Sequence, residues 1–458
     1  MIILKIMLIK NFKSLALSKE RKIALEIIEE GLKALDYEKT LHGLNGFITD
    51  IARINTDTPR MDTDLKRINT DNPRISVLDP CSSVGDVYLV GFGKGSAKIA
   101  DILRKKIKFK EIYVIDVKGR YFLGTHPLPS RKNFLFTQKL VKRFQGKLIK
   151  DDLVIVLVCG GGSAMLVYPK IDLKKYIQVN QELLKSGANI YEMNTVRKHL
   201  DLVKGGGLLK IFYPATVVSL IFSDVPGNDL SFIASGPTVK DTTKIADALR
   251  IIKKYKLKSI KKEDLIETPK EEKYFQRVKN ILVLSNLTAL RAMKEKAESF
   301  GFKAKILTDN LKGDVENVAK FLFSKIKKNK ENILICGGET TVKVKGKGKG
   351  GRNQELVLWF LKYLTTNKHG YNVGVNPFLY QRSSVVIVSL NSDGWDNTEF
   401  AGAIGDKMTI EKAKKLNLDI DKFLENNDSF NFFKRVKDGI VTGRLPVNVA
   451  DLILVWKI

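Results

Sequence analysis

The chain has 458 residues, 44% of them hydrophobic and 28% charged, which suits two or three globular domains and excludes a low-complexity chain. Lys and Arg number 79 against 50 acids, so the net charge is +29. Such a charge attracts polyanions, and either a nucleic acid or an anionic small substrate would suit it. Because much of the excess lies in helix-like stretches that mix lysines with acids, such as residues 251–265, we expect no specific nucleic-acid partner.

Apolar runs and cysteines limit the cellular setting. No run approaches the ~20 apolar residues of a membrane helix, so we expect no membrane partner. Cys81, Cys159 and Cys336 lie far apart, which excludes a disulfide framework or a spaced zinc site and suits the reducing cytoplasm.

The first 80 residues contain a helix between two segments without a core pattern. Residues 1–13 are apolar but interrupted by Lys5 and lack a cleavage signal, so they are predicted to form an N-terminal extension. Residues 18–36 have helical spacing of apolar side chains. A polar repeat, "RINTDTPR" and "RINTDNPR", predicts an inserted loop over 53–77.

Two series of buried strands follow. Continuous Val/Ile/Leu runs in 86–93, 111–117, 152–164 and 215–227 alternate with helical segments, which indicates parallel strands covered on both faces. A second series starts after the lysine-rich stretch that ends near 279 and has the order βαβαβ. We therefore predict an α/β protein of two domains, each with a mostly parallel sheet covered by helices: a Rossmann-like domain over 14–275 and another α/β domain over 276–458.

The stretch "GFGKGS" (91–96) joins a strand to a helix. Gly93 lets the backbone approach a ligand and Ser96 begins the helix, whose free amides suit an anion, so Gly93 and Ser96 are predicted to bind the cofactor. Lys94 adds a positive charge. The motif is not a Walker A loop, but it is close to G-x-G-x-x-G, and Asp116, at the end of the next strand, could take the place of the ribose-binding acid of a dinucleotide fold. One alternative is therefore an NAD-dependent oxidoreductase of a small hydroxy acid, and another is an ordinary tight turn.

A second glycine turn, "CGGGSA", ends the strand of 152–164. Gly160, Gly161, Gly162 and Ser163 are predicted to bind an anion, although Ser163 could equally cap a helix. Further along, residues 194–209 are expected to be helical, with Arg197 and Lys204 on one face. These two cations could clamp an anionic substrate, or they could be surface charges.

Carboxylates follow two strands. Asp224 ends the strand of 215–227, where α/β sheets bind ligands, and it could bind Mg²⁺ or accept a hydroxyl proton. Asp393 and Asp396, in "NSDGWD", also follow a strand, and Asp393 is predicted to be a second metal ligand.

The stretch "VKGKGKGGRNQE" (344–355) lies between a strand and a likely helix, so it is not a disordered tail. Its lysines and glycine amides would suit a polyphosphate. Lys347 and Gly350 are therefore predicted to bind nucleotide, Arg352 to contact phosphate or carboxylate, and Asn353 to contact substrate.

Seven blocks occur in one order: "GFGKGSAKIA", "THPLPS", "CGGGSAML", "NTVRKHLDLVKGG", "SDVPGNDLSFIASGPT", "GGETTVKVKGKGKGGRNQELVL" and "NSDGWD". In these blocks the chain resembles the glycerate 2-kinases of the MOFRL type from about residue 20 to its end. The resemblance implies transfer of a phosphoryl group from ATP to the 2-hydroxyl of D-glycerate, with a divalent metal such as Mg²⁺. It also implies an active site in a cleft between two α/β domains, with Lys94 and Asp224 as its central pair. We expect a monomer or a homodimer.

Overall fold

The computed structural model describes residues 7–42, 46, 85–365 and 385–458, and the predicted insertion over 53–77 lies outside them. The chain forms two compact units. The first unit is Tyr37–Val283, and the second unit combines Met1–Asp36 with Leu284–Ile458.

The first unit is built on a six-stranded sheet in the order β3-β2-β1-β4-β5-β6. The pairings of β1 with β2, β1 with β4, β2 with β3 and β4 with β5 are parallel. All seven residues of β4, Leu153–Cys159, are buried, as expected for a parallel strand with both faces covered. The strands are β1 Val87–Phe92, β2 Glu111–Asp116, β3 Phe122–Leu123, β4 Leu153–Cys159, β5 Thr216–Phe222 and β6 Val278–Leu284.

Helices cover this first sheet. Apolar residues of α6 and α10 pack on one face together with alternate residues of β1 and β4, and α5 packs against β1, β2 and β4. The helices are α3 Tyr37–His42, α5 Ser96–Leu103, α6 Arg131–Phe144, α7 Gly162–Met165, α8 Leu173–Lys185, α9 Ile190–Lys198, α10 Gly207–Phe212 and α11 Ile245–Lys254, with short 3₁₀ turns at Ile233–Ser235, Lys262–Asp264 and Glu272–Tyr274.

The second unit has a six-stranded sheet of mixed direction, in the order β11-β10-β9-β12-β8-β7. Only the pairing of β7 with β8 is parallel, and the other four pairings are antiparallel. The prediction of a mostly parallel sheet is correct for the first unit and wrong here. The strands are β7 Ala304–Asp314, β8 Ile333–Thr341, β9 Val385–Asn391, β10 Gly402–Gly405, β11 Gly439–Ile440 and β12 Asp451–Lys457.

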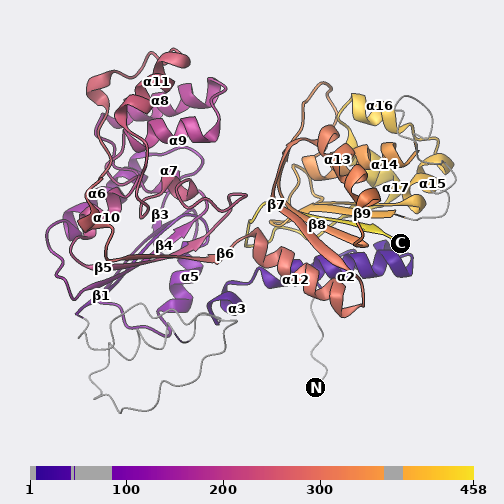
Figure 1. Ribbon diagram of the computed structural model, residues 1–458, viewed down its shortest axis with the longest axis horizontal. Coiled ribbons are helices and arrows are strands. Elements are labelled where there is room, and N and C mark those ends of the chain that lie inside the picture. Colours follow the sequence, from indigo (N-terminus) through magenta and orange to yellow (C-terminus); the bar gives the residue numbers. More distant parts are fainter. Residues whose placement is uncertain (1–6, 43–45, 47–84, 366–384) are drawn as a thin grey trace, which may run out of the picture. The chain divides into compact units, whose positions relative to one another are not determined.

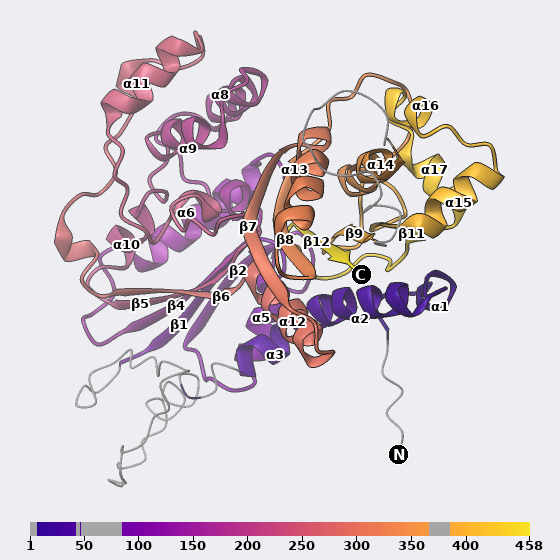
Figure 2. The ribbon, with the colours of Figure 1, turned by 45° about the vertical axis from the view of Figure 1, so that its right-hand side comes forward.

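Helices lie on both faces of this second sheet (Figures 1 and 2). Helices α2 and α12 contact each other and one face, whereas α13 and α14 pack on the other face in an apolar cluster of this unit. The helices are α1 Phe12–Leu15, α2 Lys19–Ala34, α12 Asn286–Ser299, α13 Val315–Lys328, α14 Arg352–Thr365, α15 Lys407–Lys415, α16 Ile420–Glu425 and α17 Ser429–Val436.

The unit boundaries differ from the predicted ones at both ends. Helix α2 belongs to the second unit because its Arg21 side chain, fully buried, bonds to Asp406 and Asp438. Residues next to it in the predicted extension also pack there, since the Lys10 amide donates to the Val441 carbonyl at 2.7 Å. Strand β6, expected to open the second domain, instead completes the first sheet beside β5.

Candidate functional site

Two glycine turns of the first unit are hydrogen-bonded to each other at the ends of β1 and β4. The Lys94 amide donates to the Gly160 carbonyl at 2.8 Å, and the Lys94 side chain is exposed. Gly93 has φ 104°, and a Cβ there would overlap the Cys159 carbonyl, so only glycine allows this approach. The structure therefore brings Lys94 beside the turn at 160–163.

Ser96 and Asp116 shape the first turn from inside. The buried Ser96 hydroxyl donates to the carbonyls of Gly93 (2.8 Å) and Ile115 (3.1 Å). The Asp116 carboxylate accepts the amides of Gly95 (2.9 Å) and Ala97 (3.1 Å) and so covers the start of α5. The structure gives Ser96 a packing role in place of the predicted ligand contact, and the buried Asp116 carboxylate is not available as the predicted ribose acceptor.

The second turn brings Asp224 and His126 close to Lys94. A Cβ on Gly160 would overlap the Asp224 carboxylate, and one on Gly161 (φ 76°) would lie 2.7 Å from His126 Cδ2. Burial, and then the charge of Lys94, lower the pKa of His126. His126 was not among the predicted site residues, although it lies in the block "THPLPS".

Arg197 is a partly buried cation. It lies on α9, donates from Nε to Asn180 Oδ1 at 2.7 Å, and burial lowers its pKa. Among the described residues no carboxylate lies within 4.0 Å of its guanidinium. A buried cation without an acidic partner is costly unless an anion binds to it. Arg197 therefore remains a predicted substrate contact.

The helix predicted over 194–209 is wrong, because α9 ends at Lys198 and Lys204 lies in the turn before α10. Lys204 is fully buried, and its ammonium donates to the carbonyls of Ser163 (2.7 Å) and Leu166 (3.0 Å). Burial lowers its pKa to about 8. Lys204 thus fixes the end of α7 and the carbonyl of Ser163, a role that the sequence pattern did not reveal.

Ser163 is part of a chain of polar side chains. Its hydroxyl lies 2.7 Å from that of Ser235, which donates to Asn194 Oδ1 at 3.1 Å. Ala234 and Ser235 have φ values of 52° and 64°, which non-glycine residues rarely adopt. Such backbone strain is concentrated at functional sites and persists where the surroundings enforce it.

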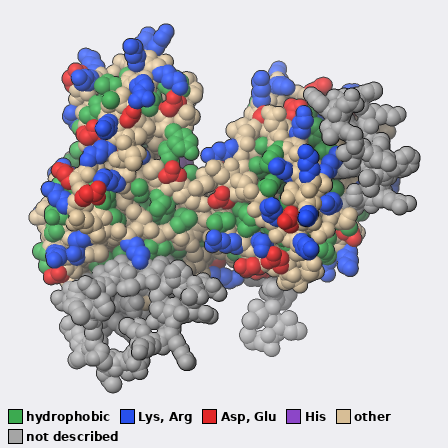
Figure 3. Space-filling model, viewed as in Figure 1, with side chains coloured by type: hydrophobic (Ala, Val, Ile, Leu, Met, Phe, Trp, Pro, Cys, Tyr) green, Lys and Arg blue, Asp and Glu red, His purple; other side chains and the backbone are tan. Residues whose placement is uncertain are grey.

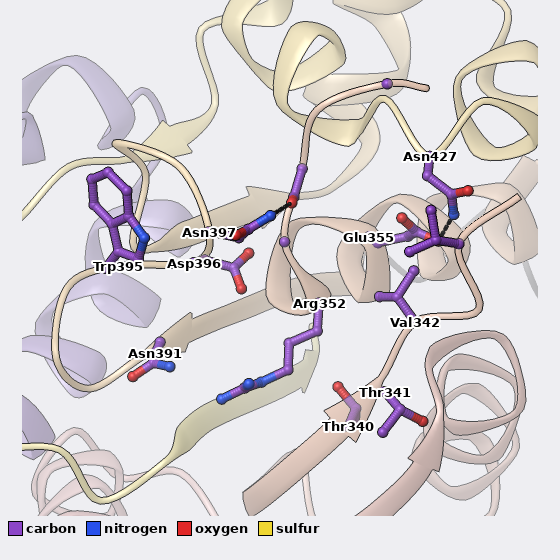
Figure 4. Close-up of a pocket in the computed structure, with 14 residues that line it drawn as sticks. Thr340, Thr341, Val342, Arg352, Glu355, Asn391, Trp395, Asp396, Asn397 and Asn427 are labelled. Carbon is purple, nitrogen blue, oxygen red and sulfur yellow. Dashed lines mark hydrogen bonds between the residues drawn. The ribbon is translucent and has the colours of Figure 1, made fainter. Parts of the chain in front are cut away.

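A pocket of about 530 Å³ lies in the second unit, within the ~300–1,000 Å³ usual for small-molecule sites (Figure 4). Arg352, at the start of α14, donates to both carboxylate oxygens of Asp451 (2.7 and 3.0 Å) and to Glu339 (2.9 Å). The residues around the pocket are Thr340, Thr341, Val342, Val344, Gly348, Gly350, Gly351, Arg352, Glu355, Asn391, Trp395, Asp396, Asn397 and Asn427.

The lysine–glycine alternation of 345–350 has a structural cause. A Cβ on Gly346 or Gly348 would overlap the backbone of Asn426, whereas the intervening lysines are exposed. The loop amides bond to residues 426–428, for example Gly348 N–H to the Asn426 carbonyl at 2.8 Å. These amides are therefore not arranged as the predicted phosphate cradle, and Lys347 does not line the pocket.

The start of α14 is covered by a side chain of the same unit. Asp396 accepts the amides of Asn353 (3.1 Å) and Gln354 (2.9 Å). Asn353 itself is fully buried, donates to Asp451 Oδ1 at 2.8 Å, and accepts from Ser389 at 2.6 Å. Asn353 therefore organises the acids behind Arg352, in place of the predicted substrate contact.

The two predicted metal ligands belong to different units. Asp224 is in the first unit, whereas Asp393 is in the second, outside the pocket, where its Oδ1 accepts the Trp395 amide at 3.0 Å. In the part of the chain that the structure describes, no three His, Cys, Asp or Glu side chains cluster as a metal site would require. The prediction of Asp393 as a metal ligand gains no support from its position.

Glu355 makes the stability of the second unit depend on pH. Asn427 Nδ2 donates to Glu355 Oε1 at 2.9 Å, and burial raises the pKa of Glu355 from 4.5 to about 7. The folded state retains this proton between pH 4.5 and about 7 while the unfolded chain loses it, so ionisation destabilises the fold as pH rises through this window. We expect Glu355→Gln to raise the melting temperature by about 2–4 °C at pH 8 and to have no such effect near pH 4.5.

Thermal melts from pH 4.5 to 8, followed by tryptophan fluorescence, measure this difference. The exposed Glu425 of the same unit supplies the matched control, and Glu425→Gln should show no pH-dependent gain. A constant difference between Glu355→Gln and the unmodified protein at every pH would contradict the prediction.

Comparison with known proteins identifies the family. Residues 25–267 match the domain of unknown function DUF4147, and residues 332–451 match the MOFRL family. A glycerate 2-kinase of Pyrococcus horikoshii is 32% identical over 402 residues, which cover 81% of this chain and 87% of the relative. The chain belongs to the glycerate 2-kinase family of the MOFRL type. The crystal structure of a glycerate kinase from Thermotoga maritima has a TM-score of 0.74 and 30% identity, and it covers 95% of this chain and 99% of that one.

One member of this glycerate kinase family bears a different name. A putative hydroxypyruvate reductase of Agrobacterium vitis is 34% identical over 396 residues, covering 80% of this chain and 86% of the relative. A reductase would need a dinucleotide site, but the Asp116 carboxylate already accepts hydrogen bonds from the amides of Gly95 and Ala97 and so is not available for a ribose. The oxidoreductase alternative is therefore not favoured.

On the face drawn in Figure 3, the Lys and Arg side chains of each unit are scattered among acidic and apolar ones, without a continuous basic stripe. Within residues 7–42, 85–365 and 385–458, no helix combines the length and the apolar character needed to cross a bilayer.

Proposed function

We propose that the protein is a kinase that transfers the γ-phosphoryl group of ATP to the 2-hydroxyl of D-glycerate, giving 2-phosphoglycerate and ADP. The observation that carries the proposal is the membership of the glycerate 2-kinase family over most of the chain. Two features of the first unit support it: Lys94 and Asp224 both lie against the glycine turn at 160–163, and Arg197 supplies a partly buried cation on α9.

The substrate carboxylate binds to Arg197 in this proposal. Its guanidinium is partly buried and has no acidic partner among the described residues, so a bound anion with a single negative charge would neutralise its positive charge. Lys204 holds the Ser163 turn nearby, and Arg197 contributes to the lowered pKa of Lys204. Glycerate supplies the required single negative charge.

Phosphoryl transfer needs positioning and compensation of charge more than covalent chemistry by the protein. The 2-hydroxyl oxygen of glycerate bonds to the γ-phosphorus, the bond from that phosphorus to the bridging oxygen breaks, and ADP leaves. Asp224 orients the hydroxyl and takes its proton. Lys94 compensates the charge that develops on the transferred group, while the turn at 160–163 holds phosphate oxygens. Arg352 contacts one further phosphate.

Mg²⁺ is the metal that this chemistry suggests. Proteins usually hold Mg²⁺ with one or two carboxylates and the phosphates of the nucleotide. The first unit offers one such carboxylate, Asp224, beside a glycine that carries no side chain against it. Asp224 with phosphate oxygens fits this donor set, and the ion would compensate phosphate charge when bound.

An ADP-release assay tests the function. We expect phosphorylation of D-glycerate and much lower rates with glycolate, lactate or hydroxypyruvate, because these lack either the second hydroxyl or the correct acceptor. NMR of the product then distinguishes attachment at carbon 2 from attachment at carbon 3. Oxidation of NADH by hydroxypyruvate, without release of ADP from ATP and glycerate, would refute the proposal.

The proposed function also includes a cellular compartment and an oligomeric state. The thiols of Cys159 and Cys336 are free and buried, which is compatible with a reducing compartment, and we propose that the enzyme acts in the cytoplasm. Analytical ultracentrifugation distinguishes the monomer from the homodimer.

A further inference from the structure

The charges around the pocket of the second unit do not suit a polyphosphate. Arg352 is the one cation among the described residues that line it, whereas Glu355 and Asp396 also line it. The Arg352 guanidinium is itself bonded to Asp451 and Glu339. The carboxylates of Asp451, Glu339 and Asp396 all act on this one guanidinium and repel a multiply charged anion, although Arg352 can still bind one phosphate.

Apolar surface is available in the same pocket. The Trp395 side chain is 40% exposed and Val344 is 72% exposed, although both are large hydrophobic residues. The Arg444 guanidinium lies 4.1 Å from the indole centroid and supports the ring. Figure 4 shows Trp395 on one side of Arg352 and Val342 with Glu355 on the other. A flat, uncharged ring can stack on such an indole.

The polar groups of the pocket suit hydroxyl and amine groups. Thr340 is 3% exposed, and its hydroxyl oxygen has no hydrogen-bond partner among the described residues. An orphaned buried hydroxyl is unfavourable, so a ligand that bonds to it would remove the cost. The amides of Asn391, Asn397 and Asn427 add donors and acceptors around the same space.

We propose that this pocket binds the nucleoside part of ATP, with the base against Trp395 and only the nearest phosphate at Arg352. The inference rests on the proposed kinase function, since that function makes ATP the donor. It assigns base and ribose to the residues around 340–352 and 391–397, whereas the sequence had suggested a polyphosphate site in 344–355.

Intrinsic fluorescence of the full-length protein tests the assignment directly. The chain has three tryptophans, and we expect AMP and ADP to quench Trp395 while inorganic tripolyphosphate does not. Trp395→Phe should abolish the quenching, whereas Trp359→Phe should retain it, because Trp359 stacks on Tyr363 within α14. Quenching by tripolyphosphate without quenching by AMP would overturn the proposal. Nucleotide quenching of unchanged size in Trp395→Phe would also overturn it.

Kinetics supply a second readout. Trp395→Ala should raise the KM for ATP by about tenfold and change the KM for glycerate by less than about twofold, as expected for lost base–aromatic stacking. An unchanged KM for ATP in an active enzyme would refute the pocket assignment and leave the kinase function standing. Conversely, nucleotide quenching at Trp395 without phosphorylation of glycerate would refute the function alone.

Thr340→Val separates binding from stability. Removal of an unpaired buried hydroxyl should leave the melting temperature unchanged or higher, yet raise the KM for ATP about threefold or more if the hydroxyl bonds to the nucleoside. Ser219 is the matched control, because its hydroxyl is equally buried and unpartnered but lies in β5, outside the pocket. An equal KM for ATP in Thr340→Val and Ser219→Ala would contradict the proposed contact.

Discussion

Replacement of Lys94 by alanine is expected to lower kcat about 10²–10³-fold, the usual effect of removing one group that stabilises transition-state charge. Lys94 lies between Gly93 and Gly95, and the hydrogen bond from its backbone amide to the Gly160 carbonyl fixes it beside the second turn. Because the lysine acts on charge that develops during transfer, kcat should fall more than the affinity for glycerate.

The charge of Lys94 also has a readout that does not depend on turnover. Lys94 contributes to the lowered pKa of His126, so Lys94→Ala should raise the His126 pKa in an NMR titration. Lys105→Ala is the matched control, since Lys105 is an exposed lysine of the same strand–helix unit. Near-normal kcat and KM for both substrates in Lys94→Ala would show that the assignment is wrong.

Arg21→Met is expected to destabilise the second unit by about 3–5 kcal/mol, the range found when one partner of a buried ion pair is removed. The Arg21 side chain is fully buried and bonds to Asp406 (2.6 and 2.7 Å), Asp438 (2.7 Å) and Thr409 (2.8 Å). Methionine preserves much of the volume but leaves two buried carboxylates without this cation. Lys412, 2.7 Å from Asp438, compensates only one of them.

Denaturant unfolding followed by tryptophan fluorescence measures the change in the free energy of unfolding of the second unit. All three tryptophans, Trp359, Trp395 and Trp456, lie in the second unit, so their emission reports its unfolding. Lys407→Met is the control, because Lys407 is next to Asp406 but exposed, and its loss should cost less than about 1 kcal/mol. A loss of similar size in both variants would mean that the buried network contributes little.

Local pattern predicted those parts of the fold that depend on local burial. The uninterrupted apolar run of β4 indicated a parallel strand covered on both faces, and the structure confirms it. The glycine turns at 91–96 and 160–163 were each predicted at a strand end, and the structure joins them by the hydrogen bond from the Lys94 amide to the Gly160 carbonyl. Seven motif blocks in one order indicated the family.

Strand direction and chain crossing could not be predicted in the same way. The run of β12 is as apolar as that of β8, yet β12 inserts antiparallel between β8 and β9. Apolar periodicity records which faces are buried, but direction depends on which strands pair, and those partners are distant in sequence. Likewise, α2 joins the second unit because Arg21 meets Asp406, 385 residues later.

The sequence by itself determined the family, because the order of the motif blocks along the chain can be read without any tertiary contact. It also determined the covered parallel sheet of the first unit and the glycine turns at its strand ends, because these follow from residues close together in the chain. Only the tertiary structure decided which polar groups are already paired. It placed Asp116 and Asp396 over the starts of α5 and α14, turned Asn353 toward the buried acids, and left the Arg197 guanidinium with no carboxylate of the described residues within 4.0 Å. The physical reason is that a side chain's function depends on the hydrogen-bond partners that it has already, and folding brings those partners from distant parts of the chain.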